Sequence, residues 1–499
     1  MNDATPSADY LDKGFLGHPI GLRTLFLTEM WERMSFYGMR GLLVLFMTAE
    51  VFNGGFAISQ SEANTIVAIY VGMVYFMSLP GGWIADRLLG KQKAVLYGGI
   101  IIALGHYCLA VPMKETFYIG LSLVVLGTGL LKPNISAIVG ELYTRADPRR
   151  DAGFTIFYMA INIGSFLGFL ICGYLGENVN WHYGFGAAGI GMTFGVAQYI
   201  LTLKNLGGAG TEIQEKDPNK RKQQLTFVLV IVVALFAFVL AGIFGLWALD
   251  AILLNRILAL IIGLISIIYF VFIYFFGKLT PLEKKNMVMI VFLFLGAAAF
   301  WAGFDQSAGS FNNFAKYNTN LSFFGLFEMP ASWVQLINPT FVVLFAPFFA
   351  ALWLRLGAKN MEPGAPVKFA FGVILNGFGF LIMVYAVYAA VEAADGRVGV
   401  QWLLLVYLFQ TLGELSLSPV GLSAMSKYSP KRYSGQMMGV WFLASAFGGM
   451  IAGQIGFEAA SEGLGFMDDV FLNTFYALAG LGVVLIVASR FIKGEILED

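Results

Sequence analysis

Fourteen apolar segments of membrane-spanning length constrain this sequence more than any other feature. A helix needs roughly 20 apolar residues to cross the hydrocarbon core of a bilayer. The longest plainly polar stretch runs only from Lys204 to Leu225, so no extramembrane domain of normal size fits. The segments lie at 24–48, 62–85, 94–112, 117–140, 153–176, 183–203, 225–248, 252–276, 287–311, 332–354, 368–391, 401–425, 434–456 and 470–490.

The composition agrees with a chain that is surrounded mostly by lipid. Hydrophobic residues make up 58% of the chain and charged residues only 12%, about half the usual share in soluble proteins. This excludes a soluble enzyme, a nucleic-acid-binding protein and a disordered scaffold, and predicts an all-α integral membrane protein with the lipid bilayer as its partner. The net charge of zero gives no reason to expect a polyanionic partner.

The metal-binding residue types are few and scattered. Two cysteines and three histidines form no ligand spacing, so we expect no metal and no cofactor. The first apolar segment contains two glutamates and an arginine, which is a poor signal-peptide core, so we expect the N-terminus to be retained.

Basic residues predict the orientation, because cytoplasmic loops of membrane proteins are enriched in lysine and arginine. An even number of spans places both termini on one side. With that side in the cytoplasm, 24 basic residues lie inside and only four outside, namely Lys114, Arg256, Lys316 and Arg397. We therefore predict cytoplasmic termini.

The spans fall into groups of six, two and six, which predicts two six-helix halves with an inserted two-helix hairpin. The predicted domains are an N-terminal bundle at 1–203, a linker and hairpin at 204–278, and a C-terminal bundle at 279–499. Such halves are a transporter architecture. Because the hairpin carries almost no internal polar group, we interpret it as a lipid-facing spacer.

The first span contains four charged residues, Glu29, Glu32, Arg33 and Arg40. Uncompensated, they would cost on the order of 10 kcal/mol on insertion scales. At the angular spacing of a helix they form one polar stripe, which must face protein or water. Spacings of three and four residues let Glu29 and Glu32 pair with Arg33 on the helix itself. A structural ion pair is one interpretation and a functional site is the other.

Further charged residues in other spans favour function. Lys132 lies in the fourth span, and Asp305 and Glu414 lie in the second half. Basic groups in one half and acidic groups in the other suit a zwitterionic ligand, with its carboxylate at Arg40 and Lys132 and its ammonium at Glu414. A buried carboxylate that loses its arginine partner takes up a proton, which is the physics of proton coupling.

Several motifs then resemble one family in the same order. They are ExxERxxFYGMR from residue 29, GTGLLKPN from 127, RRDAGF from 149 with FYxxINxGS from 157, FWxxxDQ from 300, and GExxxSP from 413. They resemble the signatures of the proton-coupled oligopeptide transporters, a branch of the major facilitator superfamily. The resemblance implies the major facilitator fold, with the extra hairpin between the halves as in bacterial members.

The resemblance also implies roles for individual residues. Proton coupling would involve Glu29, Glu32, Arg33 and Lys132, and gating would involve Asp305, Arg40, Asp86 and Arg87. The residues expected to contact substrate are Arg40, Tyr37, Tyr75, Lys132, Tyr158, Asn162, Trp301, Asn338, Glu414, Ser418 and Trp441. Phe36 stands where many members have tyrosine, and Asp305 where glutamate is usual. Asn162 and Asn338 could equally be interhelical hydrogen-bond partners, and we interpret His106 as a satisfied core residue.

Together these features predict a proton-driven symporter for di- and tripeptides in the bacterial inner membrane, working by alternating access as a monomer. We predict no enzymatic activity, and protons as the coupling ion in place of a cofactor. One alternative is a transporter of the same fold for nitrate, a glycoside or a drug. The other is a polytopic membrane enzyme, for which the loops hold no catalytic constellation.

Overall fold

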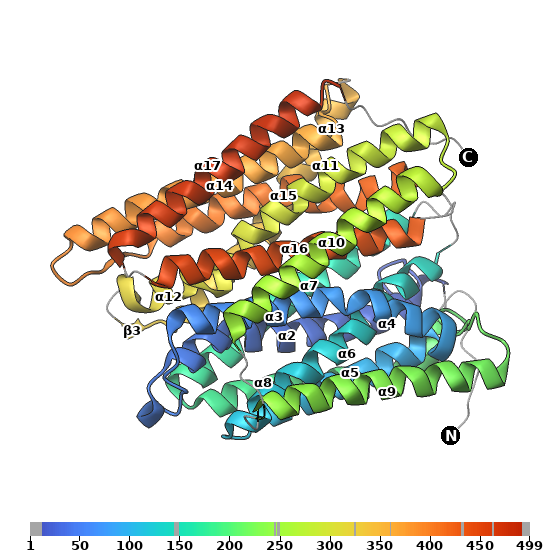
Figure 1. Cartoon of the computed structure of the whole chain (residues 1–499), viewed down its shortest axis with the longest axis horizontal. Helices are drawn as coiled ribbons and strands as arrows, with labels where there is room; N and C mark the ends of the chain where they lie inside the picture. Colours follow the sequence, from blue (N-terminus) through green and yellow to red (C-terminus); the bar gives the residue numbers. More distant parts are fainter. Residues whose placement is uncertain are drawn as a thin grey trace. The chain divides into compact units, whose positions relative to one another are not determined.

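The computed structural model of the chain consists almost entirely of helices (Figure 1). It describes residues 12–491 except 144–148, 244–245, 247–249, 324–325, 360, 431–433 and 462–463. Within these residues, 12 helices are long and apolar enough to cross a membrane. Two further long helices, α2 and α5, fall outside that set: α2 carries five charged residues and α5 begins with two lysines. The predicted all-α membrane fold is confirmed.

The helices and strands group into two compact units, which are described one at a time. Unit 1 comprises Met1–Leu42 and Phe76–Leu249. Its helices are most of α2 (Ile20–Thr48), then α4 (Ser78–Ile84), η2 (Ala85–Leu89), α5 (Lys91–Leu109), α6 (Lys114–Glu141), α7 (Arg150–Asn178), α8 (Trp181–Thr202), η3 (Leu203–Leu206) and α9 (Pro218–Ile243).

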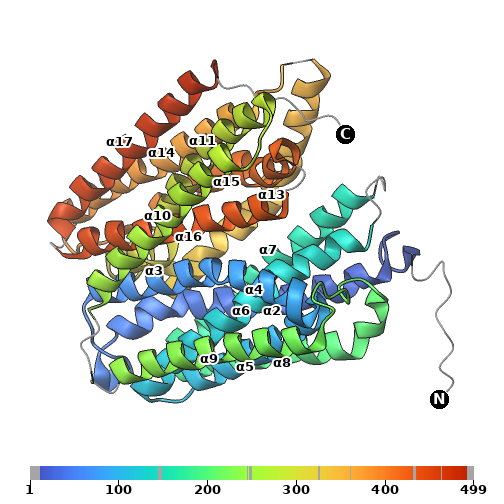
Figure 2. The same cartoon turned by 45° about the vertical axis from the view of Figure 1, so that its right-hand side comes forward.

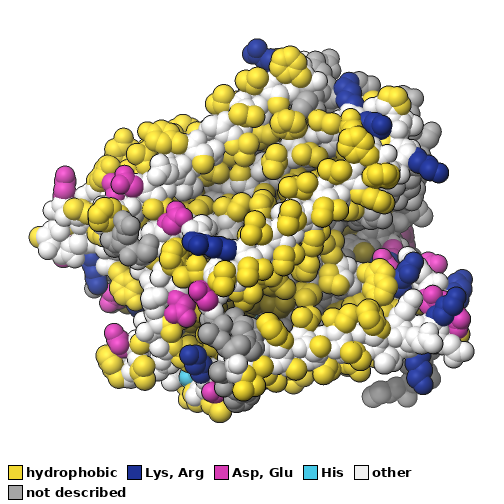
Figure 3. Space-filling model, in the orientation of Figure 1, with side chains coloured by type: hydrophobic (Ala, Val, Ile, Leu, Met, Phe, Trp, Pro, Cys, Tyr) yellow, Lys and Arg dark blue, Asp and Glu magenta, His cyan; other side chains and the backbone are white. Residues whose placement is uncertain are grey.

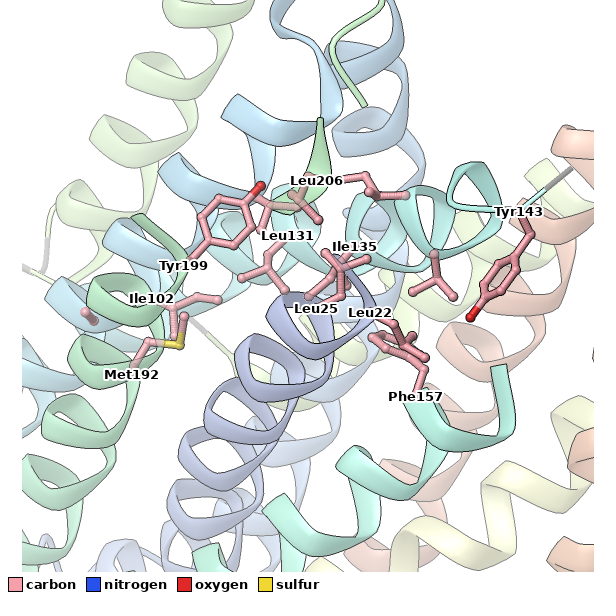
Figure 4. Close-up of a cluster of buried hydrophobic side chains, with 14 residues drawn as sticks. Leu22, Leu25, Ile102, Leu131, Ile135, Tyr143, Phe157, Met192, Tyr199 and Leu206 are labelled. Atoms are coloured by element: carbon pink, nitrogen blue, oxygen red, sulfur yellow. The ribbon is translucent and has the colours of Figure 1, made fainter. Parts of the chain in front are cut away.

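Within unit 1, α5 packs along both α6 and α8, and the three run side by side in Figures 1 and 2. Buried side chains from α2, α5, α6, α7 and α8 meet in one hydrophobic cluster (Figure 4). Leu25 of α2 and Leu131 of α6 are fully buried there. This cluster fixes α2 against α6, so it positions the charged stripe of α2 relative to Lys132.

Unit 2 comprises Leu43–Tyr75 and Asp250–Asp499. Its main helices, α14 and α17, run along each other in both views (Figures 1 and 2). Its elements are η1 (Val51–Asn53), α3 (Gln60–Phe76), α10 (Ala251–Phe276), α11 (Pro281–Phe304), η4 (Asp305–Ala308), α12 (Ser310–Asn318), β1 (Thr319–Asn320), β2 (Ser322–Phe323), β3 (Phe327–Glu328), η5 (Ala331–Leu336), α13 (Ile337–Ala358), α14 (Ala365–Glu392), β4 (Val398–Gly399), α15 (Gln401–Tyr428), α16 (Ser434–Ser461) and α17 (Leu464–Ala488).

The strands of unit 2 are short and lie in the connections. β1 pairs with β4 in parallel, and β2 pairs with β3 antiparallel. Capping residues mark the starts of two helices. Thr280 and Glu283 form a capping box at the start of α11, whose first residue is Pro281. The Asp250 side chain accepts hydrogen bonds from backbone N–H groups in the first turn of α10. The domain boundaries after 203 and 278 follow sequence order rather than packing, and they stay a prediction.

The surface agrees with a lipid environment. Hydrophobic side chains cover most of the face in Figure 3, and most charged side chains lie toward helix ends. The two hairpin helices differ, however. None of the described side chains in the apolar part of α9 is buried, whereas α10 buries Asn255, Ile262, Ser266, Phe270 and Ile273. The interpretation of the hairpin as a lipid-facing spacer stays a prediction: α10 buries one set of side chains, whereas others on it, such as Leu260 and Ile268, are exposed.

Candidate functional site

The charged stripe of α2 forms a compact buried ion cluster in unit 1. Glu29, Glu32 and Arg33 each expose 2% or less of their surface. The Arg33 guanidinium donates to both carboxylate oxygens of Glu32 through Nε and Nη2, and its Nε lies 3.4 Å from Glu29 Oε1. Glu29 Oε2 is buried and has no hydrogen-bond partner among the described residues. Both carboxylate oxygens of Glu32 thus accept hydrogen bonds from Arg33, whereas only Oε1 of Glu29 lies near the guanidinium, so the Glu29 carboxylate is half engaged.

The ring of Phe36 supports this cluster from below the guanidinium. Arg33 Cζ lies 4.7 Å from the centre of the Phe36 ring and 5.9 Å from that of Tyr37. A guanidinium over an aromatic face is attracted by the ring quadrupole. Phe36 therefore acts through its ring, and the missing hydroxyl does not prevent contact with Arg33. Tyr37 in turn packs against Phe169 of α7 at 5.8 Å between ring centres.

Two more cations join the cluster electrostatically. Lys132, on α6, interacts with the charges of Glu29, Glu32, Arg33 and Arg40. Arg40 lies two turns beyond Arg33 on α2 and is 5% exposed. The structure therefore brings together the proton-coupling set predicted from the sequence, with Arg40 as its neighbour along the helix.

Two residues that were predicted to contact substrate, Tyr158 and Asn162, lie on α7. Tyr158 is half-buried, and Asn162 is 8% exposed. The Asn162 amide donates to the Tyr158 carbonyl of its own helix at 3.2 Å. This bond occupies one amide hydrogen and leaves the Asn162 carbonyl oxygen for another partner.

Asp86 and Arg87, predicted as gating residues, lie in η2 at one end of unit 1. Lys91 Nζ bridges Asp86 at 3.0 Å and Glu141 at 2.9 Å. Partial burial alone would lower the pKa of Lys91, but its hydrogen bonds to Glu141 and Asp86 outweigh that effect and leave this pKa raised. Arg87 lies over the ring of Trp83 at 6.0 Å.

The linker after η3 contacts the group formed by Lys91, Asp86 and Glu141. The sequence analysis did not predict this contact. Gly210 N donates to Glu141 Oε2 at 2.6 Å. Gln92 donates to the carbonyls of Gly207 and Ala209 through its side-chain amide and to that of Gly210 through its backbone N–H. Gln214 N donates to the Asp86 carbonyl at 2.9 Å. The linker from 207 to 215 is therefore held on unit 1 by backbone contacts.

Unit 2 holds Glu414 in a second polar cluster. Asn338 Nδ2, at the start of α13, donates to Glu414 Oε2 at 2.9 Å and to Thr411 Oγ1 at 3.0 Å. Glu414 and Ser418 are each 8% exposed, and Ser418 Oγ has no hydrogen-bond partner among the described residues. Asn338 is thus an interhelical partner of Glu414. Thr411 was not predicted, because its role depends on a contact with another helix.

The remaining predicted residues of unit 2 lie on α3, α11, η4 and α16. Trp301 packs edge-on against Phe300 and Phe304, and its Nε1 is buried without a hydrogen-bond partner among the described residues. Trp441 is 5% exposed and stacks at right angles to Phe369. The half-buried Asp305 begins η4, and Tyr75 lies near the end of α3.

Histidine and metal ligands play no visible part in these clusters. His106 is fully buried, as predicted for a core residue, but neither ring nitrogen has a hydrogen-bond partner among the described residues, so it is not a satisfied one. In the described part of the chain, no three His, Cys, Asp or Glu side chains gather closely enough to hold a metal ion.

Comparison with known proteins gives one consistent result. A model of the POT family matches residues 92–457. A Bacillus subtilis protein named uncharacterized transporter YclF is 42% identical over 96% of both chains. A di-/tripeptide transporter of Lactococcus lactis subsp. cremoris is 39% identical over 98% of this chain and 97% of its own. The crystal structure of a peptide transporter POT in complex with sulfate superposes with a TM-score of 0.89, at 38% identity and 97% coverage of each chain.

Proposed function

We propose that this chain, which belongs to the POT family, is a transporter that carries di- and tripeptides across the membrane together with protons. Its fold and its relatives are those of peptide transporters and not of enzymes. The alternatives of nitrate, glycoside or drug transport receive no support from any described contact.

The half-engaged carboxylate of Glu29 is the observation that carries proton coupling. A buried oxygen without a hydrogen-bond donor is costly, and a proton on that carboxyl group removes the cost. Arg33 can hold one carboxylate by two bonds or share itself between two. We infer that protonation of one glutamate releases Arg33 toward the other, with Lys132 as the nearby cation that responds.

The substrate ends are assigned by charge. In unit 1, Arg40 and Lys132 are the proposed partners of the peptide carboxylate, with Tyr37, Tyr158 and Asn162 as further contacts. In unit 2, Glu414 is the proposed partner of the peptide ammonium. Asn338 and Thr411 keep its carboxylate in one position. Tyr75, Trp301, Ser418 and Trp441 complete the proposed contacts, and Asp305, Arg40, Asp86 and Arg87 the proposed gates.

The position in the cell is proposed on the same basis. The chain is a multi-pass membrane protein, and its relatives are bacterial. We infer the inner membrane with both termini in the cytoplasm, from the excess of basic residues in the loops on that side. We also propose that it works as a monomer built from a bundle at 1–203, a linker and hairpin at 204–278, and a bundle at 279–499.

The test is uptake of a labelled dipeptide into proteoliposomes with an imposed pH gradient. The proposal expects accumulation that collapses with a protonophore and that unlabelled di- and tripeptides compete away. Tetrapeptides and free amino acids serve as the comparison. Equal uptake with and without the gradient would refute proton coupling, and competition by nitrate or a glycoside but not by peptides would refute the substrate class.

A further inference from the structure

The second hairpin helix, α10, carries a buried amide in a largely apolar segment. Asn255 is 3% exposed, and its Nδ2 donates to the Met450 carbonyl of α16 at 3.1 Å. An asparagine in a membrane-spanning helix is costly in lipid unless a neighbouring helix provides a partner. The bond therefore fixes α10 on α16 at one level along the two helices.

At the same level α16 packs against α3 through small residues. We name this contact the α3–α16 seam; it comprises Asn64, Ala68 and Gly72 of α3 with Gly449, Gly453 and Gly456 of α16. A Cβ atom added to Gly453 would collide with Ala68 Cβ, and one added to Gly449 would lie 3.5 Å from Gly72 N. The lack of side chains allows the two backbones to approach closely, as in small-residue crossings of membrane helices.

Asn64 secures one end of the seam by hydrogen bonds. Its Nδ2 donates to the Gly456 carbonyl at 2.9 Å, and its Oδ1 accepts from Asn313 Nδ2 of α12 at 3.3 Å. Asn64 and Asn313 are at most 4% exposed. Hydrogen bonds of buried side chains therefore hold the seam together at the Gln60 end of α3.

Gly453 is the residue where the three helices meet. An added Cβ there would contact Ala68 on one side and would lie 3.3 Å from Asn255 Nδ2 on the other. Asn255 also holds the carbonyl of Met450, whose methyl group packs against Gly72. α16 is therefore held between α3 and α10, and α10 limits how far α16 can move away from α3.

We propose that α10 braces α16 through Asn255 and thereby favours the closed form of the α3–α16 seam. The inference rests on the proposed function, because alternating access requires α3, from the first half of the sequence, to separate from α16 of the second. Opening of the seam breaks the Asn64 bonds, and it is opposed by every contact that holds α16 in place. The inserted hairpin thus sets the equilibrium between the closed and open forms of the seam, and it does so through the amide of Asn255.

The test measures the distance between the ends of α3 and α16 with spin labels. Glu62 and Glu458 are exposed at these ends, and Cys172 is fully buried, so a Cys108→Ser background with Glu62→Cys and Glu458→Cys labels only the intended pair. The transporter is measured whole in nanodiscs. Asn255→Leu keeps the branched shape of the side chain and removes the hydrogen bond. It should raise the ratio of long to short distances by about threefold to tenfold, the value of one interhelical hydrogen bond in a membrane.

Two variants make the result decisive. Ser266→Ala on the same helix removes a buried hydroxyl that bonds only to Ile262 of its own helix, and it should leave the distances unchanged. Asn64→Ala should raise the long-distance population and shows that the labels report the seam. If Asn64→Ala responds and Asn255→Leu matches Ser266→Ala, the brace is refuted; if neither Asn64→Ala nor Asn255→Leu responds, the seam does not open.

Separate controls address the folding of the Asn255→Leu variant and the proposed function. If Asn255→Leu does not purify as a folded protein, Asn255→Ser replaces it, with the same expected direction. The distance measurement needs no peptide, so loss of peptide uptake in the unmutated chain would refute the proposed function and leave the brace to be decided by the labels.

Discussion

Glu414 offers the most direct test of how the substrate ammonium is bound. The carboxylate is 8% exposed and accepts a hydrogen bond from Asn338 on Oε2. The change Glu414→Gln keeps the size of the side chain and an acceptor for Asn338. What it removes is the negative charge, with little other change in the cluster.

The size of the effect follows from the nature of the lost contact. A hydrogen bond to a charged group in a largely buried site contributes about 1.5–3 kcal/mol, which corresponds to roughly tenfold to a hundredfold in affinity. Free dipeptide should therefore bind Glu414→Gln about tenfold to a hundredfold more weakly. An N-acetylated dipeptide lacks the ammonium, so it should bind both proteins weakly and almost equally.

The assay is a two-by-two comparison of the two ligands on the two proteins, by calorimetry or by competition against a labelled dipeptide. Thr411→Val is the matched control, because it removes one partner of Asn338 and leaves the Glu414 charge in place. It should weaken binding only a few-fold. If the acetyl group and Glu414→Gln weaken binding additively, Glu414 does not hold the ammonium and its charge serves another step.

Four further predictions concern unit 1. Glu32→Gln should abolish accumulation driven by a pH gradient and keep exchange of internal for external peptide; concentration of peptide at the unmutated rate would exclude Glu32 from coupling. Glu141→Ala should release the linker and speed tryptic cleavage at Lys216 several-fold, with unchanged cleavage speaking against the linker contacts. The ion pairs of Lys91 hold its pKa above the ordinary lysine value. Its contribution to the free energy of unfolding should therefore be constant below the ordinary lysine pKa and be lost as pH rises through the raised pKa. Denaturant-induced unfolding measured at several alkaline pH values would show this loss. Phe36→Leu removes the ring beneath a buried guanidinium and should lower the free energy of unfolding by about 1–2 kcal/mol, measured as thermal stability in detergent; no change would mean that the ring contributes only volume.

The helices could be predicted from sequence because lipid leaves few choices. A backbone in hydrocarbon must satisfy its hydrogen bonds within the segment, so each long apolar segment becomes a helix. The same reasoning located the buried stripe of α2, and helical spacing predicted the contact between Glu29 and Arg33. These features depend on one segment at a time, which is what a single sequence expresses well.

The remaining features depend on contacts between distant segments. Asn338 meets Thr411 and Glu414 across more than 70 residues, and Asn255 meets Met450 across 195. No local pattern marks an asparagine as a partner of another helix, so these roles required the fold.

The membership of residues 43–75 in unit 2 has a consequence for attempts to divide the protein. A cut between α9 and α10 would leave this segment covalently attached to the first fragment, although it packs with the second. The two fragments would then share an arm, as protomers do in domain swapping. The second fragment could not complete its core, because it would lack α3, and the first would carry Asn64 with its amide exposed. Reassembly from two coexpressed pieces would therefore begin with the insertion of this arm.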